Sequence, residues 1–239
     1  MESIAPRHSP LEPLLIGSGA TMLQEFGVAF ASNFGSVAGE VAACLRSVGL
    51  ADRSDLVKLD VTGPAGAVAA LLAAIVPRPP APGEAVHVHR AWWSVVTPRH
   101  VFVLVDPSHA AAVLERLGRA ARSRRELTWT DASDAWAVIA VIGPRAAALM
   151  RAPTLMADAP PPDPGAVVEV SLAGTDAVVI RESPQEFLVS VPPSGAEVVW
   201  RALHAAGAHL GVASVGREAH ERFEIAAGIR RSRTDHSGW

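Results

Sequence analysis

The segment from His87 to Trp93 gathers the side chains that could do chemistry in this sequence. In an extended strand, His87 and His89 point to one face, while Arg90 and Trp92 point to the other. The two histidines could move a proton near neutral pH, contact a ligand, or serve only in packing. They could also hold a metal ion, but no third ligand and no carboxylate stand nearby, so we expect no metal site.

Arg90 and Trp92 would place a cation beside an aromatic face, and Trp93 adds a second indole. Such a surface suits a flat ring system or a carboxylate. The alternative is a core tryptophan beside an exposed arginine. We therefore take Arg90, Trp92 and Trp93 as candidate ligand-binding residues.

Two aspartates, Asp55 and Asp134, stand at matching places in two similar segments. Turn formation beside the preceding serine is one interpretation of both. The other is a pair of carboxylates able to accept a proton. Asp134 is accordingly a candidate catalytic base together with His87 and His89.

An internal repeat predicts the elements that position these side chains. Segment 52–64 recurs as 131–144, each with Asp, Ser and Asp before a closing Gly-Pro. Pro82-Gly83 recurs as Pro164-Gly165, and 97–108 recurs as 183–194. Each copy reads as strands and helices in one order, with Gly-Pro between a strand and a helix. We predict an α+β fold of two duplicated halves, with helices on one face of antiparallel sheets.

The expected division is an N-terminal arm (1–35), a first half (36–125), a second half (126–229) and a mobile tail (230–239). In the arm, phenylalanines at 26, 30 and 34 have a spacing compatible with a helix. Amphipathic or buried helices are predicted at 36–48, 65–76, 109–121, 195–206 and 216–226.

Composition excludes several classes of protein. Hydrophobic residues make up 49% and charged residues 19%, which excludes a mainly disordered chain. The formal net charge of −3 gives no basic field for nucleic acid. The single cysteine, Cys44, excludes an intramolecular disulfide and a cysteine-based zinc site. Neither a signal-peptide pattern nor an apolar run of membrane length occurs, so we expect a cytoplasmic protein.

At these landmarks the sequence resembles the T-protein (aminomethyltransferase) superfamily of folate-binding proteins. The resemblance is carried by segments 48–64, 136–146 and 215–228. It implies two ferredoxin-like halves around a central channel that binds tetrahydrofolate. The implied reaction is one-carbon transfer, of an aminomethyl or methyl group. Arg181 would then clamp an anionic ligand, and His220 would contact it.

The sequence also departs from this family. The hairpin that carries the family's catalytic acid corresponds to 87–97, which has no carboxylate, and the folate-binding glutamate falls on Leu188. The C-terminal barrel has no counterpart. The gamma subunit of heterotetrameric sarcosine oxidase, a shorter relative, also lacks the barrel and the acid.

Two functions therefore remain open. One is an enzyme that binds folate or another small molecule, with a transferase or repurposed activity. The other is a non-catalytic subunit that packs on a larger flavoprotein. The expected partners are a small-molecule ligand and either a second copy or a larger subunit, but neither nucleic acid nor a membrane.

Overall fold

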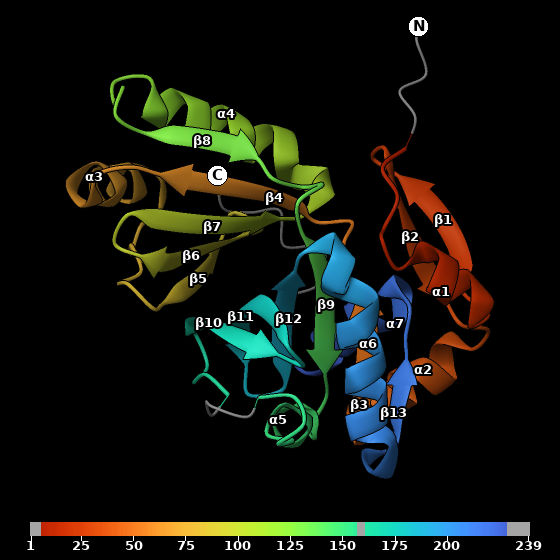
Figure 1. Cartoon of the computed structure of the whole chain (residues 1–239). Coiled ribbons are helices and arrows are strands. Elements are labelled where there is room, and N and C mark those ends of the chain that lie inside the picture. The colour runs from red at the N-terminus through yellow and green to blue at the C-terminus, as the bar shows by residue number, and fades with distance from the viewer. Residues whose placement is uncertain (1–5, 157–160, 229–239) are drawn as a thin grey trace, which may run out of the picture.

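The computed structural model describes residues 6–156 and 161–228, which form three sheets and the helices around them (Figure 1). The expected tail at 230–239 lies outside the described residues. No described helix is long and apolar enough to cross a membrane.

The N-terminal arm folds as a short helix and a hairpin. The elements are α1 (Glu12–Gly17), β1 (Thr21–Glu25) and β2 (Val28–Asn33). The phenylalanine spacing at 26, 30 and 34 therefore does not mark a helix. Phe26 and Gly27 both have positive φ, 51° and 74°, and form the two-residue turn that joins the antiparallel strands.

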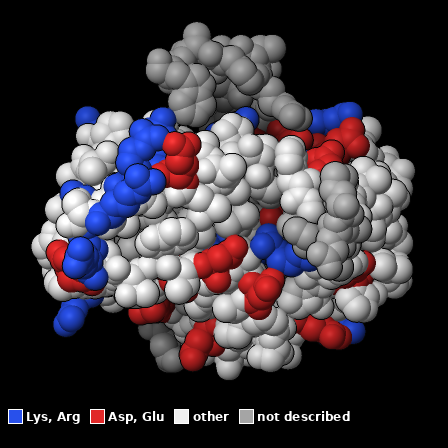
Figure 2. Space-filling model, turned by 90° about the horizontal axis from the view of Figure 1, so that it is seen from above, with Lys and Arg blue, Asp and Glu red and all other residues white. Residues whose placement is uncertain are grey.

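The first half forms a five-stranded sheet in the order β5-β6-β7-β4-β8. Its strands are β4 (Val57–Thr62), β5 (Ala85–Val88), β6 (Ala91–Thr97), β7 (His100–Val105) and β8 (Thr128–Asp131). Helices α3 (Ala65–Ile75) and α4 (Ala110–Ala121), the latter after a 3₁₀ turn at Pro107–His109, pack with the outward residues of this sheet in one apolar core. Figure 2 shows arginine side chains gathered on the side where α4 lies, which agrees with a solvated basic helix.

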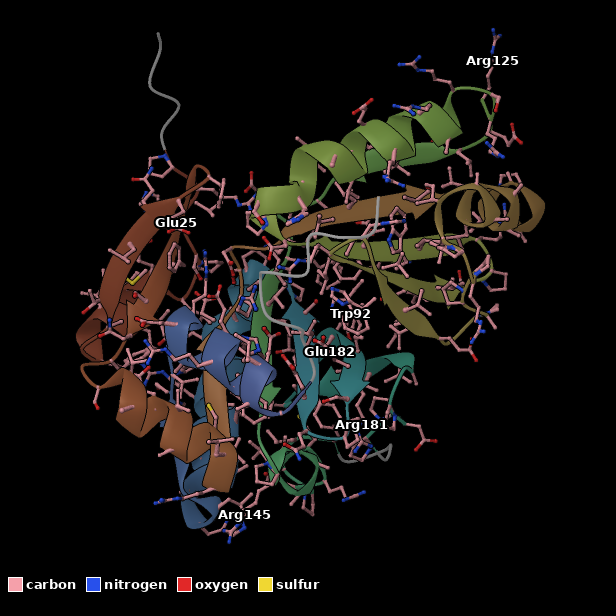
Figure 3. All side chains as sticks on the ribbon, turned by 180° about the vertical axis from the view of Figure 1, so that it is seen from behind. Glu25, Trp92, Arg125, Arg145, Arg181 and Glu182 are labelled. Carbon is pink, nitrogen blue, oxygen red and sulfur yellow. The ribbon has the colours of Figure 1, made fainter. Side chains whose placement is uncertain are left out.

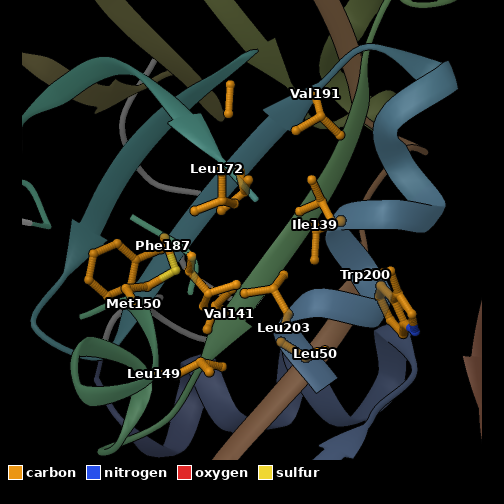
Figure 4. Close-up of a cluster of buried hydrophobic side chains, with 14 of the residues drawn as sticks. Leu50, Ile139, Val141, Leu149, Met150, Leu172, Phe187, Val191, Trp200 and Leu203 are labelled. Carbon is orange, nitrogen blue, oxygen red and sulfur yellow. The ribbon is translucent and has the colours of Figure 1, made fainter. Parts of the chain in front are cut away.

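The second half forms a six-stranded sheet in the order β10-β11-β12-β9-β3-β13. Its strands are β3 (Val48–Asp52), β9 (Ala137–Ile142), β10 (Val167–Leu172), β11 (Thr175–Ser183), β12 (Glu186–Val191) and β13 (Val212–Ser214). Helices α5 (Ala146–Met150) and α6 (Pro193–Gly207), followed by a 3₁₀ turn at Ala208–Leu210, pack on its outer face. Figure 4 shows this core, where Leu203 of α6 lies beside Ile139 and Val141 of β9, and Trp200 of α6 belongs to the same cluster.

Two further helices, α2 (Val37–Arg46) and α7 (Arg217–Ala226), pack against each other. Ser36 caps α2 by accepting a hydrogen bond from the Gly39 amide at 3.2 Å. The helices predicted at 36–48, 65–76, 109–121, 195–206 and 216–226 are thus confirmed.

Strand register confirms the internal duplication. In the first sheet Asp60 of β4 lies opposite Phe102 of β7, and in the second sheet Ala140 of β9 lies opposite Leu188 of β12. Ala140 stands 80 residues after Asp60, and Leu188 stands 86 residues after Phe102. These are the offsets at which the Gly-Pro turns and the 97–108 and 183–194 segments repeat.

The two halves exchange strands. β3, which precedes β4, pairs with β9 of the second sheet, while β8, which precedes β9, pairs with β4 of the first. The Val138 amide donates to Ser54 Oγ at 3.1 Å, and the Lys58 amide donates to Ser133 Oγ at 3.0 Å. The expected boundary at 125/126 thus divides a chain whose halves are interlocked through these strands.

The opposite edges of the two sheets are joined by the repeated Pro-Gly landmarks. The Ala85 amide donates to the Gly165 carbonyl at 2.7 Å, and the Val167 amide donates to the Gly83 carbonyl at 2.9 Å. Because the sheets are joined along both edges, their inner faces are held toward each other.

Candidate functional site

The inner faces of the two sheets meet in a buried apolar cluster that we call the intersheet core. Trp92, Phe102 and Leu104 of the first sheet pack with Ile180 and Leu188 of the second. Residues of α7 join this cluster, namely Val215 just before the helix and Ala219 and Phe223 within it. The resemblance implies a central ligand channel here, where the structure packs these side chains against one another.

Three polar atoms on the inner faces are buried without a hydrogen-bond partner: Trp92 Nε1, Ser94 Oγ and Ser190 Oγ. Buried polar atoms are normally paired with protein or water, so these three mark where a polar ligand atom or a water fits. Ser94 belongs to the segment where the resemblance places the family's acid.

The hairpin of β5 and β6 corrects the expected strand geometry of His87–Trp93. The strand ends at Val88, and His89 and Arg90 form the turn with φ of 56° and 60°. Trp92 therefore returns opposite His87 on the same face, and their rings stack at 4.6 Å. His87 and His89 do not share a strand face.

The remaining residues of this segment face different surroundings. Trp93 points outward into the core beneath α3 and α4 and is 1% exposed, so the two tryptophans do not form one surface. Partial burial, together with the nearby Arg116, lowers the pKa of His89.

Arg181 is held by backbone carbonyl groups. Its Nε donates to the Ser183 carbonyl at 3.2 Å, Nη1 to Pro162 at 3.0 Å and Nη2 to Pro184 at 3.1 Å. Its guanidinium lies 5.0 Å from the Phe187 ring centroid. Figure 3 shows Trp92 and Glu182 between the sheets and Arg181 directed away from them. In this arrangement Arg181 tethers a loop, and the structure does not bring it together with His87 or Trp92.

The turn function proposed for Asp55 and Asp134 belongs to other aspartates. Asp52 and Asp131 accept hydrogen bonds from the amides two residues on, at 2.9 and 2.8 Å. Asp55 is 3% exposed and binds Arg53 Nε at 3.0 Å, whereas Asp134 is exposed. The two carboxylates therefore do not form a pair.

His220 lies in a buried network of charged side chains, although its helix face resembles a solvated one in sequence. Its Nε2 is 2.5 Å from Glu186 Oε1 and 3.6 Å from Glu224 Oε1, and its Nδ1 is 3.1 Å from Arg53 Nη1. Arg53 also pairs with Asp55 at 3.0 Å. These five side chains, each 4% exposed or less, form what we call the Arg53 network.

Sequence reasoning did not find Arg53, Glu186 or Glu224. The one available signal was the four-residue spacing of His220 and Glu224, which is equally typical of exposed helix pairs. Glu186 and Arg53 come from β12 and the β3–β4 connection, so only the tertiary structure brings them to α7.

The atoms of Glu186, His220 and Glu224 lie within 4.8 Å of one another, a spacing compatible with a metal ion. The Arg53 contact argues against it. Arginine can only donate, so His220 Nδ1 must accept, and in the neutral ring the proton then sits on Nε2. A metal ion at Nε2 would require an imidazolate. The network therefore fits a proton shared between His220 and Glu186 better than it fits a metal ion.

Lys58 is the one lysine of the sequence and is fully buried on β4. Its Nζ donates to the Ser54 carbonyl at 2.7 Å. Burial, with a contribution from Arg7, lowers the pKa of Lys58 from 10.5 to about 8.

We expect Lys58→Met to remove a pH-dependent gain in stability. Between pH 8 and 10.5 the native lysine is deprotonated while the unfolded chain still binds the proton, so stability rises with pH by about 3 kcal/mol. Urea unfolding at pH 7 to 10, followed by tryptophan fluorescence, measures this rise. The pKa of Cys44, raised to about 12 by burial, opposes the rise equally in both proteins. Parallel curves for wild type and variant would contradict the assignment.

The resemblance implies tetrahydrofolate as the cofactor, and two residues that it would involve have other surroundings in the structure. Leu188, where the resemblance places the family's folate-binding glutamate, is 2% exposed within the intersheet core. Arg181, the expected anionic clamp, binds three carbonyls instead. A pterin ring needs polar partners along its edge, and on the inner faces Trp92 Nε1, Ser94 Oγ and Ser190 Oγ are the atoms that could supply them.

Known proteins resemble this chain in both sequence and structure. Residues 93–238 match the GCVT N-terminal domain family. An aminomethyltransferase from Streptomyces avermitilis is 30% identical over 248 residues, covering 96% of this chain and 65% of that protein. One from Saccharopolyspora erythraea is 26% identical and covers 94% and 65%. The chain thus spans 65% of the length of these two relatives.

Two solved structures share the fold. Glycine cleavage system aminomethyltransferase T from Bartonella henselae superposes with a TM-score of 0.78 at 18% identity, covering 94% of this chain and 63% of that one. A chain of heterotetrameric sarcosine oxidase from Corynebacterium sp. U-96 gives 0.63 at 21% identity, covering 87% and 97%. The architecture is therefore the aminomethyltransferase-like folate-binding fold, and the chain belongs to the GCVT N-terminal domain family.

Proposed function

We propose that this chain is a non-catalytic subunit with the aminomethyltransferase fold that docks on a larger flavoprotein oxidase. One observation carries the proposal: apolar side chains of both sheets pack together in the intersheet core, and Leu188, where the resemblance places the folate-binding glutamate, is one of them. A transferase that held its cofactor between these sheets would need room and polar groups there.

The shared fold and the surface support the same proposal. One chain of a heterotetrameric sarcosine oxidase has the fold of this chain. The β1–β2 hairpin exposes Leu23 and Phe26, which are 49% and 63% accessible. Apolar side chains exposed together at a protruding hairpin suit burial against another subunit.

A second function, binding and transforming a small molecule, is favoured by the unpartnered Trp92 Nε1, Ser94 Oγ and Ser190 Oγ. Here His87, stacked on Trp92 at the edge of the intersheet core, would accept the proton. His89 in the adjoining turn and the exposed Asp134 are the other candidate bases.

The folate test separates the proposed subunit from a folate-dependent transferase. We expect 5-formyltetrahydrofolate at millimolar concentration to leave the unfolding temperature of the full chain unchanged. A ligand at 100 times its Kd would stabilise the protein by about 2.7 kcal/mol, so binding would be visible. The Streptomyces avermitilis aminomethyltransferase provides the positive control. Folate binding that is weakened by Ser94→Ala would instead support the transferase.

The subunit test uses co-expression of the full chain with candidate flavoprotein oxidase subunits from its source organism. We expect a stoichiometric complex in size-exclusion chromatography, and Phe26→Glu should disrupt it without changing the unfolding temperature. Val198→Glu is the matched control, because Val198 is 53% exposed on α6. A homogeneous monomer that forms no complex with these subunits would contradict the proposal.

A further inference from the structure

A pocket away from the intersheet core lies between α1 and α6, with β13 at its base. Its volume is about 660 Å³, and Leu14, Gly17, Trp200, Arg201, His204 and Ser214 line it. This volume falls in the range of small-molecule sites.

Flat rings form one wall of this pocket. The Trp200 and His204 rings lie 5.4 Å apart at an angle of 50°. Trp200 of α6 belongs to the apolar core of the second sheet and is 2% exposed, so it supports the wall and presents little of its own ring to a ligand. Leu14 of α1 is also part of the lining. A planar ring fits between these surfaces.

The charge of the lining selects the ligand's charge. Among the residues that line the pocket, the ionisable ones are Arg201 and His204, and there is no Asp or Glu. Arg201 pairs with Glu197 at 2.7 Å, but both side chains are more than half exposed, so this pair is weak. A guanidinium has five donors and can bind a second carboxylate.

His204 contributes a polar contact. Its Nε2 lies 3.1 Å from Ser214 Oγ at the base of the pocket. Burial lowers the pKa of His204, so the ring is neutral at pH 7 and offers a hydrogen bond without adding charge.

We propose that this pocket binds a small planar anion, an aryl carboxylate, whose ring lies between Leu14 and His204 and whose carboxylate pairs with Arg201. This inference is independent of the proposed function, because none of these residues belongs to the intersheet core or the β1–β2 hairpin.

Three probes of one shape test the charge preference: benzoate, benzamide and benzamidine. Binding to the full chain is followed by shifts of the Trp200 indole and His204 ring signals in NMR. We expect benzoate to bind best and benzamidine worst. Equal or reversed order overturns the proposal.

Two variants test the location. A side chain at Gly17 would meet open space, and Gly17 does not have a positive φ, so Gly17→Phe should fill the pocket and weaken benzoate binding by at least about tenfold. Arg201→Gln should weaken benzoate by about tenfold and leave benzamide unchanged.

Arg119→Gln is the matched control, since Arg119 and Glu115 form the same kind of exposed pair on α4. Because the Arg201 side chain is exposed, we expect Arg201→Gln to fold. It therefore still tests the location of the site if Gly17→Phe does not fold. Unchanged benzoate affinity in Arg201→Gln overturns the proposal.

Discussion

Replacing Arg53 with methionine is expected to destabilise the chain by about 3–5 kcal/mol, because it leaves a buried charge without its partner. Arg53 binds Asp55 at 3.0 Å and His220 at 3.1 Å, and its side chain is 4% exposed. Its loss would strand the Asp55 carboxylate, whose other oxygen is 3.9 Å from Arg217 Nη1. The same change would remove a link between α7 and the β3–β4 connection.

Urea unfolding of the full chain at pH 7 measures this effect. Arg119→Met, which removes an exposed pair on α4, should cost no more than about 1 kcal/mol. The double variant Arg53→Met/Asp55→Leu should recover part of the loss, since it removes the stranded charge. A single-variant cost as small as that of Arg119→Met would show that the Arg53 network does not stabilise the fold.

Gly143→Ala should cost about 3–5 kcal/mol, since it combines backbone strain with a steric clash. Gly143 has φ of 120°, a conformation that residues with a Cβ avoid. A Cβ there would also come within 2.4 Å of the Ser47 carbonyl oxygen and 2.5 Å of that of Cys44, so the backbone between α2 and β3 would have to move.

The duplicated turn supplies the control. At Gly63, the equivalent position, a Cβ would meet a flexible Leu127 carbon at 2.7 Å and the Glu126 carbonyl oxygen at 2.9 Å, both farther away than the two carbonyl oxygens at Gly143. Because φ at Gly63 is also not positive, Gly63→Ala should cost less. Gly118→Ala, in the open interior of α4, should stabilise the chain by about 1 kcal/mol. Thermal unfolding of the three variants tests this order. An equal effect at Gly143 and Gly63 would contradict it.

The duplication could be predicted because its signals are local. Gly-Pro between strand and helix, and proline-serine before a helix, reflect backbone preferences of single residues, which recur wherever the unit recurs. The α+β class, the helix positions and the family resemblance followed from them. The exchange of β3 and β8 could not be predicted, because the backbone pairs equally well with either sheet and only the assembled halves select a partner.

At the candidate site, in contrast, residue types predicted little of the final arrangement. Residue types at His87–Trp93 indicated a polar strand, but the two-residue turn at His89 and Arg90 reversed the chain and placed His87 against Trp92. Arg181 looked available for a ligand, yet nearby carbonyls bind it. His220 looked exposed, yet α7 turns it toward Glu186.

By itself the sequence determined the duplicated architecture and the family, since these depend on residue identity and order. The tertiary structure alone decided that apolar side chains of the two sheets pack together and that Arg53, Glu186 and Glu224 surround His220. The physical reason is that burial and charge pairing depend on which distant segments meet, and that is decided by packing of the whole chain.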